Sequence, residues 1–273
     1  MTLPGRLVLV GHPVAHSLSP VMQNAALEAA GIPLKYESLD VLGEDLSRTF
    51  DILAAERAAG NVTVPHKEAS RRLINRLSPT AARVGAINTF QTLGSGELSG
   101  DNTDVAGFAA LVRIALGETP KAAHVAVIGA GGSAAAVLAS MERWQNPRAT
   151  VFARRSAQAE ALAERFNDFA RAEALPLRQS LTCDIVVNAT TVGLRDDELP
   201  VPMDYLPRDV VVLDLVYRDG ETAWVRAARA SGRAAIDGLP MLVEQGAASF
   251  EIWFGTAPDR EAMWKAVRQA GRA

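Results

Sequence analysis

Short apolar runs alternate with longer amphipathic stretches along the whole chain. Each apolar run is about five residues long, the length of a buried strand, and the stretches between them have the apolar spacing of helices. The predicted strands are Arg6–Val10, Tyr36–Val41, Asn61–Val64, Ile87–Thr92, Val125–Ile128, Thr150–Phe152, Ile185–Asn188 and Val210–Leu215. The predicted helices are Pro20–Ala30, Leu46–Ala59, Val105–Leu116, Ser133–Arg143, Ala157–Ala172, Ala223–Ser231, Leu239–Gly255 and Asp259–Gly271.

This order of elements predicts an α/β protein in which parallel sheets are covered by helices. The composition changes at Leu116–Lys121, just before the strongest strand, and domain edges often lie inside the preceding helix. We therefore place a boundary near Asp104. The last two helices follow no strand of their own, so they must pack on a domain that is already built. The predicted domains are residues 1–103 with 239–273, and residues 104–238.

A glycine-rich turn follows the strand Val125–Ile128 and opens an alanine-rich helix. It reads Gly129-Ala130-Gly131-Gly132-Ser133-Ala134, the pattern of a dinucleotide-binding turn in its proper strand–turn–helix context. Gly129 would allow the tight turn, and Gly131 would allow a pyrophosphate to approach the backbone. The N–H groups of the helix N-terminus would then bind the phosphates. A glycine-rich turn that binds nothing is the alternative.

The strand after this turn predicts which dinucleotide is bound. NAD-binding folds usually have an acidic residue at the end of this strand, where it accepts from the ribose 2′-hydroxyl. Here the strand is followed by Arg154 and Arg155, whose guanidinium groups suit a 2′-phosphate. NADP is therefore favoured over NAD, although two exposed arginines without a ligand would leave the preference open.

Polar residues gather at or just after strand ends in the first half of the chain, where open parallel sheets bind ligands. Four segments carry them: His16–Pro20, Asn61–Lys67, Gly85–Thr89 and Gly100–Asp104. Their hydroxyls, amides, single lysine and carboxylates suit a small polyhydroxylated acid.

Charge and composition exclude other classes of partner. The formal net charge is −3, and neither a basic stripe for nucleic acid nor a cationic amphipathic segment for a membrane surface is present. The apolar run near the N-terminus is too short for a signal peptide or a spanning helix. A single cysteine, Cys183, excludes intrachain disulfides and cysteine-based zinc clusters, so a cytoplasmic protein is expected.

Six ordered motifs resemble the shikimate dehydrogenase family over nearly the full length of the chain. They are G-x-P-x-x-H-S-x-S-P at Gly11–Pro20, N-V-T-x-P-x-K at Asn61–Lys67, A-x-N-T at Ala86–Thr89, G-x-N-T-D at Gly100–Asp104, N-A-T-x-x-G at Asn188–Gly193, and D-G-x-x-M-L-x-x-Q at Asp237–Gln245.

The resemblance implies an enzyme that reduces 3-dehydroshikimate to shikimate with NADPH. An α/β substrate domain would be joined to a doubly wound Rossmann domain, with the C-terminal helices returning to the first. Lys67 and Asp104 would be the catalytic pair, and Ser17 and Ser19 would bind the substrate carboxylate. Ring hydroxyls would bind Asn61, Thr63, Asn88 and Gln245, with Tyr217 nearby, and the nicotinamide would lie near Leu215 and Gly238. Monomers or homodimers are both compatible with it.

The chemistry of this pair also follows from the residue types. Hydride transfer to a ketone makes an alkoxide, so a cationic donor must lie at the developing oxygen. Lys67 can donate that proton if Asp104 holds its ammonium in place. A non-catalytic shikimate or quinate sensor on the same scaffold would need no such donor, and the chain has no companion DNA-binding segment.

Three departures from the common family pattern keep other family members open as alternatives. The end of the second cofactor strand is often Asn-Arg-Thr, but here Ala153 replaces the amide and Arg155 the hydroxyl of that pattern. Ser156, which stands where an NAD-tolerant type carries an acid, favours NADP again. Pro240 replaces a frequent glycine beside the nicotinamide pocket. A quinate or aminoshikimate dehydrogenase is therefore the runner-up prediction.

No functional role is predicted for the histidines or the cysteine. His12 and His16 are four residues apart, but Pro13 spoils a helical ligand face and no third ligand is near in sequence. No metal site is expected. His66 is expected to be exposed, and Cys183 to be a thiol without chemistry.

Overall fold

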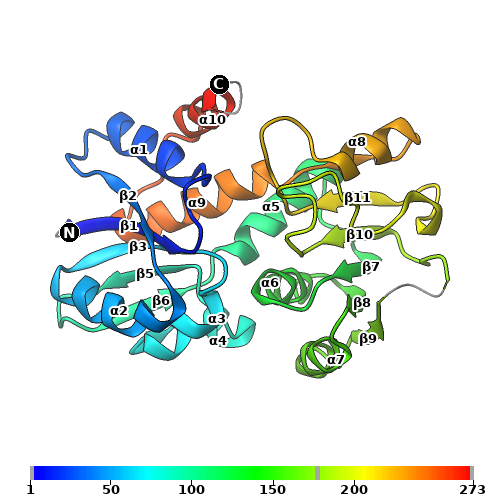
Figure 1. Ribbon diagram of the computed structural model, residues 1–273, viewed down its shortest axis with the longest axis horizontal. Helices are drawn as coiled ribbons and strands as arrows, with labels where there is room; N and C mark the ends of the chain where they lie inside the picture. Colours follow the sequence, from blue (N-terminus) through cyan, green and yellow to red (C-terminus); the bar gives the residue numbers. More distant parts are fainter. Residues whose placement is uncertain (1–2, 176–178, 271–273) are drawn as a thin grey trace. The chain divides into compact units, whose positions relative to one another are not determined.

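The computed structural model describes residues 3–175 and 179–270, and the chain forms two compact units. The first unit contains residues 1–107 and 242–273, and the second contains residues 108–241. Helices α5 (Asp104–Leu116) and α9 (Leu239–Phe254) carry the chain from one unit to the other (Figure 1). The predicted end of the last helix, Gly271, lies outside the described residues.

The first unit is built on a six-stranded mixed sheet in the order β2-β1-β3-β5-β6-β4. The strands are β1 (Arg6–Gly11), β2 (Tyr36–Asp40), β3 (Ala58–Val62), β4 (Arg76–Leu77), β5 (Thr89–Thr92) and β6 (Leu98–Asp101). β2, β1 and β3 are parallel, whereas β5 is antiparallel to both β3 and β6. The sheet is mixed because the short turn from Leu93 to Glu97 joins β5 to β6 as a hairpin, and a hairpin can only be antiparallel.

Both faces of this sheet are buried. The helices of the unit are α1 (Ser19–Ala29), α2 (Leu46–Ala55), α3 (Lys67–Ser70), α4 (Pro79–Val84) and α10 (Arg260–Ala270), with the second part of α9. Val8 and Val10 of β1 pack with Phe50 of α2 and Phe90 of β5 in one core cluster. Leu7 and Leu9 alternate with these valines and are also buried. α1 and α10 pack against each other, although 230 residues of chain separate Ala29 from Arg260 (Figure 1).

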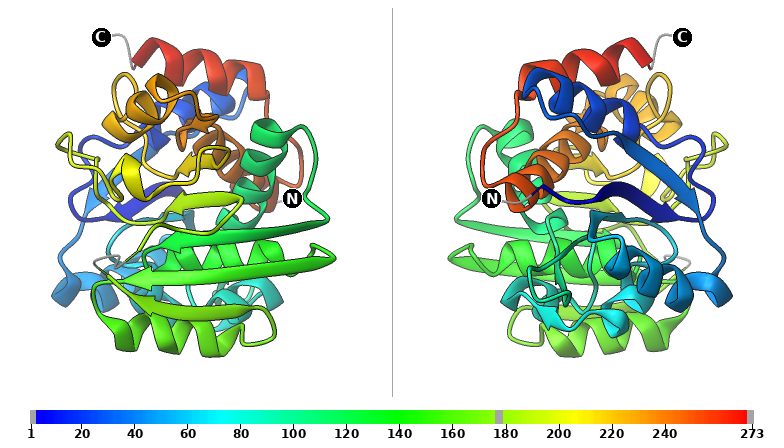
Figure 2. Two further views of the ribbon diagram at one scale, coloured as in Figure 1. Left: turned by 90° about the vertical axis from the view of Figure 1, so that its right-hand side faces the viewer. Right: turned by 90° about the vertical axis from the view of Figure 1, so that its left-hand side faces the viewer.

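The second unit is built on a six-stranded parallel sheet in the order β12-β11-β10-β7-β8-β9 (Figure 2, left). The strands are β7 (Ala122–Ile128), β8 (Asn146–Ala153), β9 (Ala170–Ala174), β10 (Ile185–Asn188), β11 (Val211–Asp214) and β12 (Ala235–Ile236). Its helices are α6 (Gly132–Met141), α7 (Ser156–Arg165) and α8 (Ala223–Ala230), with most of α5. Numbered from β7, this is the strand order 3-2-1-4-5-6 of the doubly wound dinucleotide fold. The predicted α/β class is confirmed.

The bounds of several predicted elements differ from the sequence pattern, and three of them show why. The strand predicted at Asn61–Val64 is Ala58–Val62, and the helix predicted to reach Ala59 ends at Ala55. Both errors have one cause, because alanines at 58 and 59 suit a helix by propensity but here pair with β1. The helix predicted at Ala157–Ala172 ends at Arg165, and Ala170–Ala174 is strand β9, which is held by pairing with β8.

No helix within residues 3–175 and 179–270 has the length and apolar character needed to cross a membrane.

The only cysteine, Cys183, lies two residues before β10 and is half-buried. This burial predicts a thiol of low reactivity. Burial raises the pKa of Cys183 to about 12, and the neighbouring Asp184 carboxylate acts in the same direction. At pH 8 the thiolate fraction is then about 10⁻⁴, and the thiolate is the reactive form. We expect native protein to react with Ellman's reagent at least about 100-fold more slowly than protein unfolded in guanidinium. Rapid labelling of the folded protein would contradict this environment.

Candidate active site

The ends of the strands bring the predicted polar segments to one edge of the first sheet. Parallel β1 and β3 both end at this edge, so the chain leaves them toward Ser17 and toward Lys67. β5 is antiparallel to β3, with Asn61 opposite Thr89, so the start of β5 and its preceding Asn88 lie there too. β6 runs back to the same edge, with Asp101 opposite Thr89, and leads into Asp104. Four segments distant in sequence therefore meet because of strand direction.

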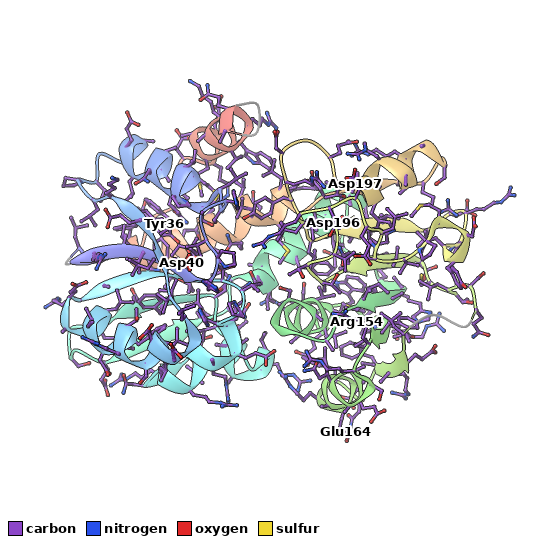
Figure 3. All side chains as sticks on the ribbon, viewed as in Figure 1. Tyr36, Asp40, Arg154, Glu164, Asp196 and Asp197 are labelled. Atoms are coloured by element: carbon purple, nitrogen blue, oxygen red, sulfur yellow. The ribbon has the colours of Figure 1, made fainter. Side chains whose placement is uncertain are left out.

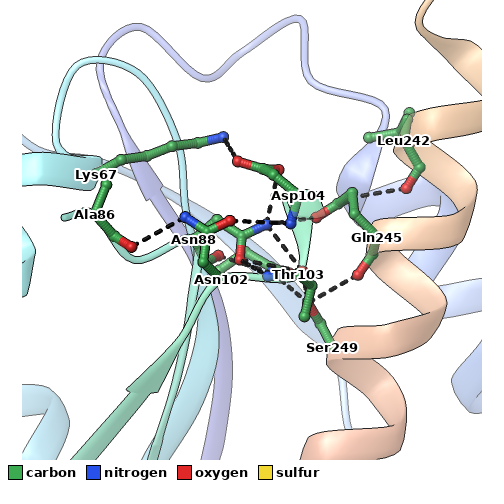
Figure 4. Close-up of polar contacts among 10 residues, drawn as sticks. Lys67, Ala86, Asn88, Asn102, Thr103, Asp104, Leu242, Gln245 and Ser249 are labelled. Atoms are coloured by element: carbon green, nitrogen blue, oxygen red, sulfur yellow. Dashed lines mark hydrogen bonds and ion pairs between the residues drawn. The ribbon is translucent and has the colours of Figure 1, made fainter. Parts of the chain in front are cut away.

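Lys67 and Asp104 form an ion pair at this edge. The distance from Lys67 Nζ to Asp104 Oδ2 is 2.5 Å, and their side chains are 16% and 5% exposed (Figure 4). Lys67 is the first residue of the short helix α3, and Asp104 is the first residue of α5. Because both groups are largely removed from water, their attraction is screened less than that of a surface pair. The ammonium is held in one place but keeps part of its surface open.

The side-chain amide of Asn88 joins the Lys67–Asp104 ion pair to the rest of the unit. Its Nδ2 lies 2.9 Å from Asp104 Oδ1 and 3.1 Å from Gln245 Oε1 on α9. Its Oδ1 accepts from the backbone N–H of Thr103 at 2.7 Å. Asn88 is 2% exposed, so these partners take the place of water. Figure 4 shows them around the amide. The carboxylate of Asp104 is thus oriented by Lys67 on one oxygen and by Asn88 on the other.

The side chain of Asn61 is hydrogen-bonded to other residues of the protein. Its Oδ1 accepts from the Tyr36 hydroxyl at 2.8 Å, and its Nδ2 donates to the Asn88 carbonyl at 3.0 Å and to Ser249 Oγ at 2.9 Å. Ser249 Oγ also lies 3.0 Å from Thr103 Oγ1 and donates to the Gln245 carbonyl. With both N–H bonds used, Asn61 has only the second lone pair of Oδ1 left for a ligand.

Three members of this network were not among the predicted site residues. Thr103 is part of the motif before Asp104, so the motif itself could have indicated it. Tyr36 and Ser249 carry no such signal, because a tyrosine at a strand start and a serine within an apolar helix are ordinary core positions. Only the fold brings them to Asn61.

His66 is buried rather than exposed, which corrects the sequence prediction. It is 3% exposed, and its Nε2 lies 2.6 Å from the Val41 carbonyl. It stands at the N-cap of α3, directly before Lys67. The ring is buried because Thr63–His66 forms a turn that folds back on the end of β2, with His66 N–H donating to the Thr63 carbonyl. His66 therefore anchors the segment that carries Lys67.

The three predicted hydroxyl residues lie on the loops of the same edge. Ser17 and Ser19 stand at the start of α1, and Ser17 Oγ accepts from the Ser19 backbone N–H at 3.2 Å. Thr63 follows β3 instead of belonging to it, and its backbone N–H donates to the Val10 carbonyl at 2.8 Å. Ser17 and Thr63 are half-buried, whereas Ser19 is buried.

The glycine turn of the second unit has the geometry of a phosphate-binding turn. Gly129 has a φ of +116°, and a Cβ there would meet the Ala189 carbonyl oxygen at 2.7 Å, so only glycine fits. Gly131 is the N-cap of α6, and a Cβ there would find no heavy atom of the described residues within 4 Å. Ala130, Gly132 and Ser133 complete the turn. Open space in front of a helix N-terminus suits a pyrophosphate.

Arg154 (Figure 3) and the next residue, Arg155, are exposed and follow β8 at the same edge of the sheet. The remaining predicted residues of the second unit follow its other strands. Leu215 and Tyr217 follow β11 and are half-buried, and Gly238 follows β12 and is buried. All of these positions lie at the carboxyl ends of parallel strands, where doubly wound sheets bind their ligands.

Among the described residues no group of three or more His, Cys, Asp or Glu side chains could hold a metal ion. His12 has a single acidic partner, Asp40, with 2.6 Å between Nδ1 and Oδ1.

Comparisons with known proteins identify the family of this chain. Residues 9–90 match the model of the shikimate dehydrogenase substrate binding domain, and residues 238–268 match that of the shikimate 5′-dehydrogenase C-terminal domain. A shikimate dehydrogenase (NADP(+)) from Thermus thermophilus is 40% identical over 272 residues, which cover 97% of this chain and 98% of that protein.

Two solved structures have the same fold. The shikimate 5-dehydrogenase of Thermus thermophilus in complex with NADP(H) and shikimate has a TM-score of 0.86 and 39% identity, covering 98% of this chain and 100% of that one. A quinate dehydrogenase from Corynebacterium glutamicum in complex with NAD has a TM-score of 0.88 and 28% identity, covering 98% and 100%. The resemblance carried by the six motifs is confirmed, and the chain belongs to the shikimate dehydrogenase family.

Proposed function

We propose that this protein is an NADP-dependent shikimate dehydrogenase that reversibly reduces 3-dehydroshikimate to shikimate, a step of aromatic amino acid biosynthesis. The observation that carries the proposal is the ion pair between Lys67 and Asp104, held at the edge of the first sheet by the Asn88 amide. Membership of the family and the relatives named for NADP support it. We assign the substrate to the first unit and the dinucleotide to the second.

The residues of the second unit fit a dinucleotide with a 2′-phosphate. The turn from Gly129 to Ser133 would hold the pyrophosphate, and Arg154 and Arg155 would bind the 2′-phosphate. Leu215 and Gly238 would line the pocket of the nicotinamide. When bound, NADPH supplies the hydride.

Lys67 is proposed as the proton donor to the ketone oxygen. As that oxygen gains negative charge, an ammonium beside it stabilises the charge and then transfers its proton. Asp104 keeps the ammonium oriented during the transfer, and Asn88 keeps Asp104 in place. In the direction of oxidation, neutral Lys67 would accept the hydroxyl proton from shikimate.

The substrate would be bound by the polar side chains around this pair. We assign the carboxylate to Ser17 and Ser19 at the start of α1, where backbone N–H groups also favour an anion. Thr63, Asn88 and Gln245 are assigned to ring hydroxyls. We also assign Asn61 and Tyr217 as further contacts of the substrate.

We also propose that the enzyme acts in the cytoplasm as a monomer or homodimer, with small molecules as its partners. The net charge of −3 gives no support to nucleic-acid or membrane binding.

A panel of substrates and cofactors tests the function. Purified protein is given shikimate, quinate or aminoshikimate with NADP or NAD, and the absorbance of the reduced cofactor is followed. We expect the highest kcat/KM with shikimate and NADP. Turnover with no combination would refute the enzyme, and a preference for quinate with NAD would make the chain a quinate dehydrogenase like the Corynebacterium protein.

Removing the proton donor should affect kcat more than binding. We expect Lys67→Ala to lower kcat at least about 100-fold, the scale of general acid catalysis, and to change the Kd of shikimate by less than about tenfold. Asp104→Asn should also lower kcat, because it leaves the ammonium without its counter-charge. Steady-state kinetics and equilibrium binding separate the two effects.

Lys35→Ala, which removes an exposed lysine of the same unit, is the matched control and should leave kcat unchanged. An unchanged kcat in Lys67→Ala would refute the role assigned to Lys67.

Removing the two arginines after β8 should weaken the preference for NADP. We expect Arg154→Ala/Arg155→Ala to raise the KM of NADP by about tenfold or more, since charge-assisted hydrogen bonds to phosphate are lost, and to leave the KM of NAD within about twofold. Arg148→Ala is the control, because Arg148 is an exposed arginine of the same strand, toward its opposite end. Equal changes for NADP and NAD would show that the arginines do not read the 2′-phosphate.

A further inference from the structure

A carboxylate that the proposed mechanism does not use lies completely buried in the second unit. Asp214, the last residue of β11, is 0% exposed. Its Oδ1 accepts from Asn188 Nδ2 at 2.8 Å and from the Val216 backbone N–H at 3.1 Å, and its Oδ2 accepts from the Thr222 hydroxyl at 2.7 Å. Burial raises the pKa of Asp214, and these three hydrogen bonds oppose the rise. Three donors therefore converge on the Asp214 side chain, which satisfies them as an acceptor.

The first partner, Asn188, shapes the loop after β10. Asn188 lies directly beside Asp214 in the parallel register and is also 0% exposed. Its Nδ2 donates a second hydrogen bond to the Val192 carbonyl at 3.1 Å, and its Oδ1 accepts from the Thr190 N–H and hydroxyl at 3.1 and 2.6 Å. Because Asp214 takes one of the two N–H bonds of Asn188, it sets which way this amide faces. The amide in turn sets the path of residues 188–193.

The second and third partners, Val216 and Thr222, fix the path of the backbone after β11. With Val216 N–H bound to Asp214 and Leu215 N–H bound to the Asn188 carbonyl at 3.0 Å, the backbone of Leu215 is held on both sides. The Leu215 carbonyl lies so close to Gly238 that no Cβ fits there. Thr222 is the N-cap of α8 and accepts from the Val225 N–H, so Asp214 also anchors the start of that helix.

The strand order places these loops on one half of a bound dinucleotide. A doubly wound sheet binds one nucleotide on each side of the point where the strand order reverses. The glycine turn after β7 and the arginines after β8 belong to the adenosine side. The loops after β10, β11 and β12 belong to the other side, that of the nicotinamide.

We propose that Asp214 is a positioning residue for the nicotinamide half of the cofactor site, acting through Asn188, Leu215 and Thr222. The inference rests on the proposed function, because it takes the dinucleotide to be NADP. Asp214 itself has no surface to offer a ligand. A purely structural role would instead make it equally important for both halves of the cofactor.

The test compares NADPH with 2′,5′-ADP, which contains only the adenosine half and its 2′-phosphate. Asp214→Asn keeps the size of the side chain but removes the carboxyl group and replaces one of its two acceptor oxygens with an N–H donor. We expect the Kd of NADPH to rise about tenfold or more, a change typical of losing a hydrogen bond to a charged group, and the Kd of 2′,5′-ADP to stay within about twofold. Isothermal titration gives both constants, and the KM of shikimate should stay within about twofold. Asp209→Asn, an exposed aspartate before β11, is the control.

A second pair of variants keeps the proposal testable if Asp214→Asn does not fold. Thr222→Ser keeps the hydroxyl that donates to Asp214 and should bind NADPH like the unmodified protein. Thr222→Val has nearly the same shape without the hydroxyl and should lose NADPH affinity but retain 2′,5′-ADP affinity. Equal losses for both ligands, or no loss for either, would overturn the inference.

Failure of the proposed function has a different signature. If the unmodified protein binds neither NADPH nor 2′,5′-ADP, NADP is not its cofactor. That result alone does not test the role of Asp214. The same variants are then compared with NADH and ADP, and a loss confined to NADH supports the positioning role, whereas equal losses refute it.

Discussion

The Asn88 amide holds together the edge of the first sheet where Lys67 and Asp104 pair. It is buried, and it joins three elements that are far apart in sequence: the start of β5, the start of α5 through Thr103 and Asp104, and α9 through Gln245. Leaving such a group without a partner would cost about 1–3 kcal/mol, so the arrangement that satisfies it is strongly preferred. The orientation of Asp104, and with it the place of Lys67, follows from that requirement.

The second unit meets the same requirement with a carboxyl group instead of an amide. Asp214 accepts from three donors, on Asn188, Val216 and Thr222. In the first unit the Asn88 amide likewise binds partners in two other segments, Thr103–Asp104 and α9. In both sheets the polar groups gather at strand ends, because the strand interiors are packed with apolar side chains. Buried polar networks at those ends select one arrangement of loops where packing alone would allow several. The ligand-binding loops can then be precise although loops are generally less constrained than strands.

Sequence patterns predicted the elements well where propensity and pairing agree. Ile185–Asn188 has the predicted bounds, and the helix predicted at Val105–Leu116 begins one residue earlier, at Asp104. They failed where a strand partner overrides propensity, as for the alanines of β3 and β9. His66 was misjudged for a similar reason, since its burial depends on the end of β2, which lies 25 residues earlier in the chain.

The sequence by itself determined the family, because six motifs of residue types at short, ordered spacings carry it. The glycine turn as a dinucleotide site and Lys67 as a proton donor stay predictions from such spacings. The structure adds that the φ of +116° at Gly129 suits only glycine, and that the Lys67 ammonium pairs with Asp104. Only the tertiary structure decided which groups hold those residues in place. Tyr36, Ser249 and the partners of Asp214 come from separate segments, and strand pairing brings them together. A hydrogen bond across a sheet edge depends on register and direction, and neither is written in the local pattern of the chain.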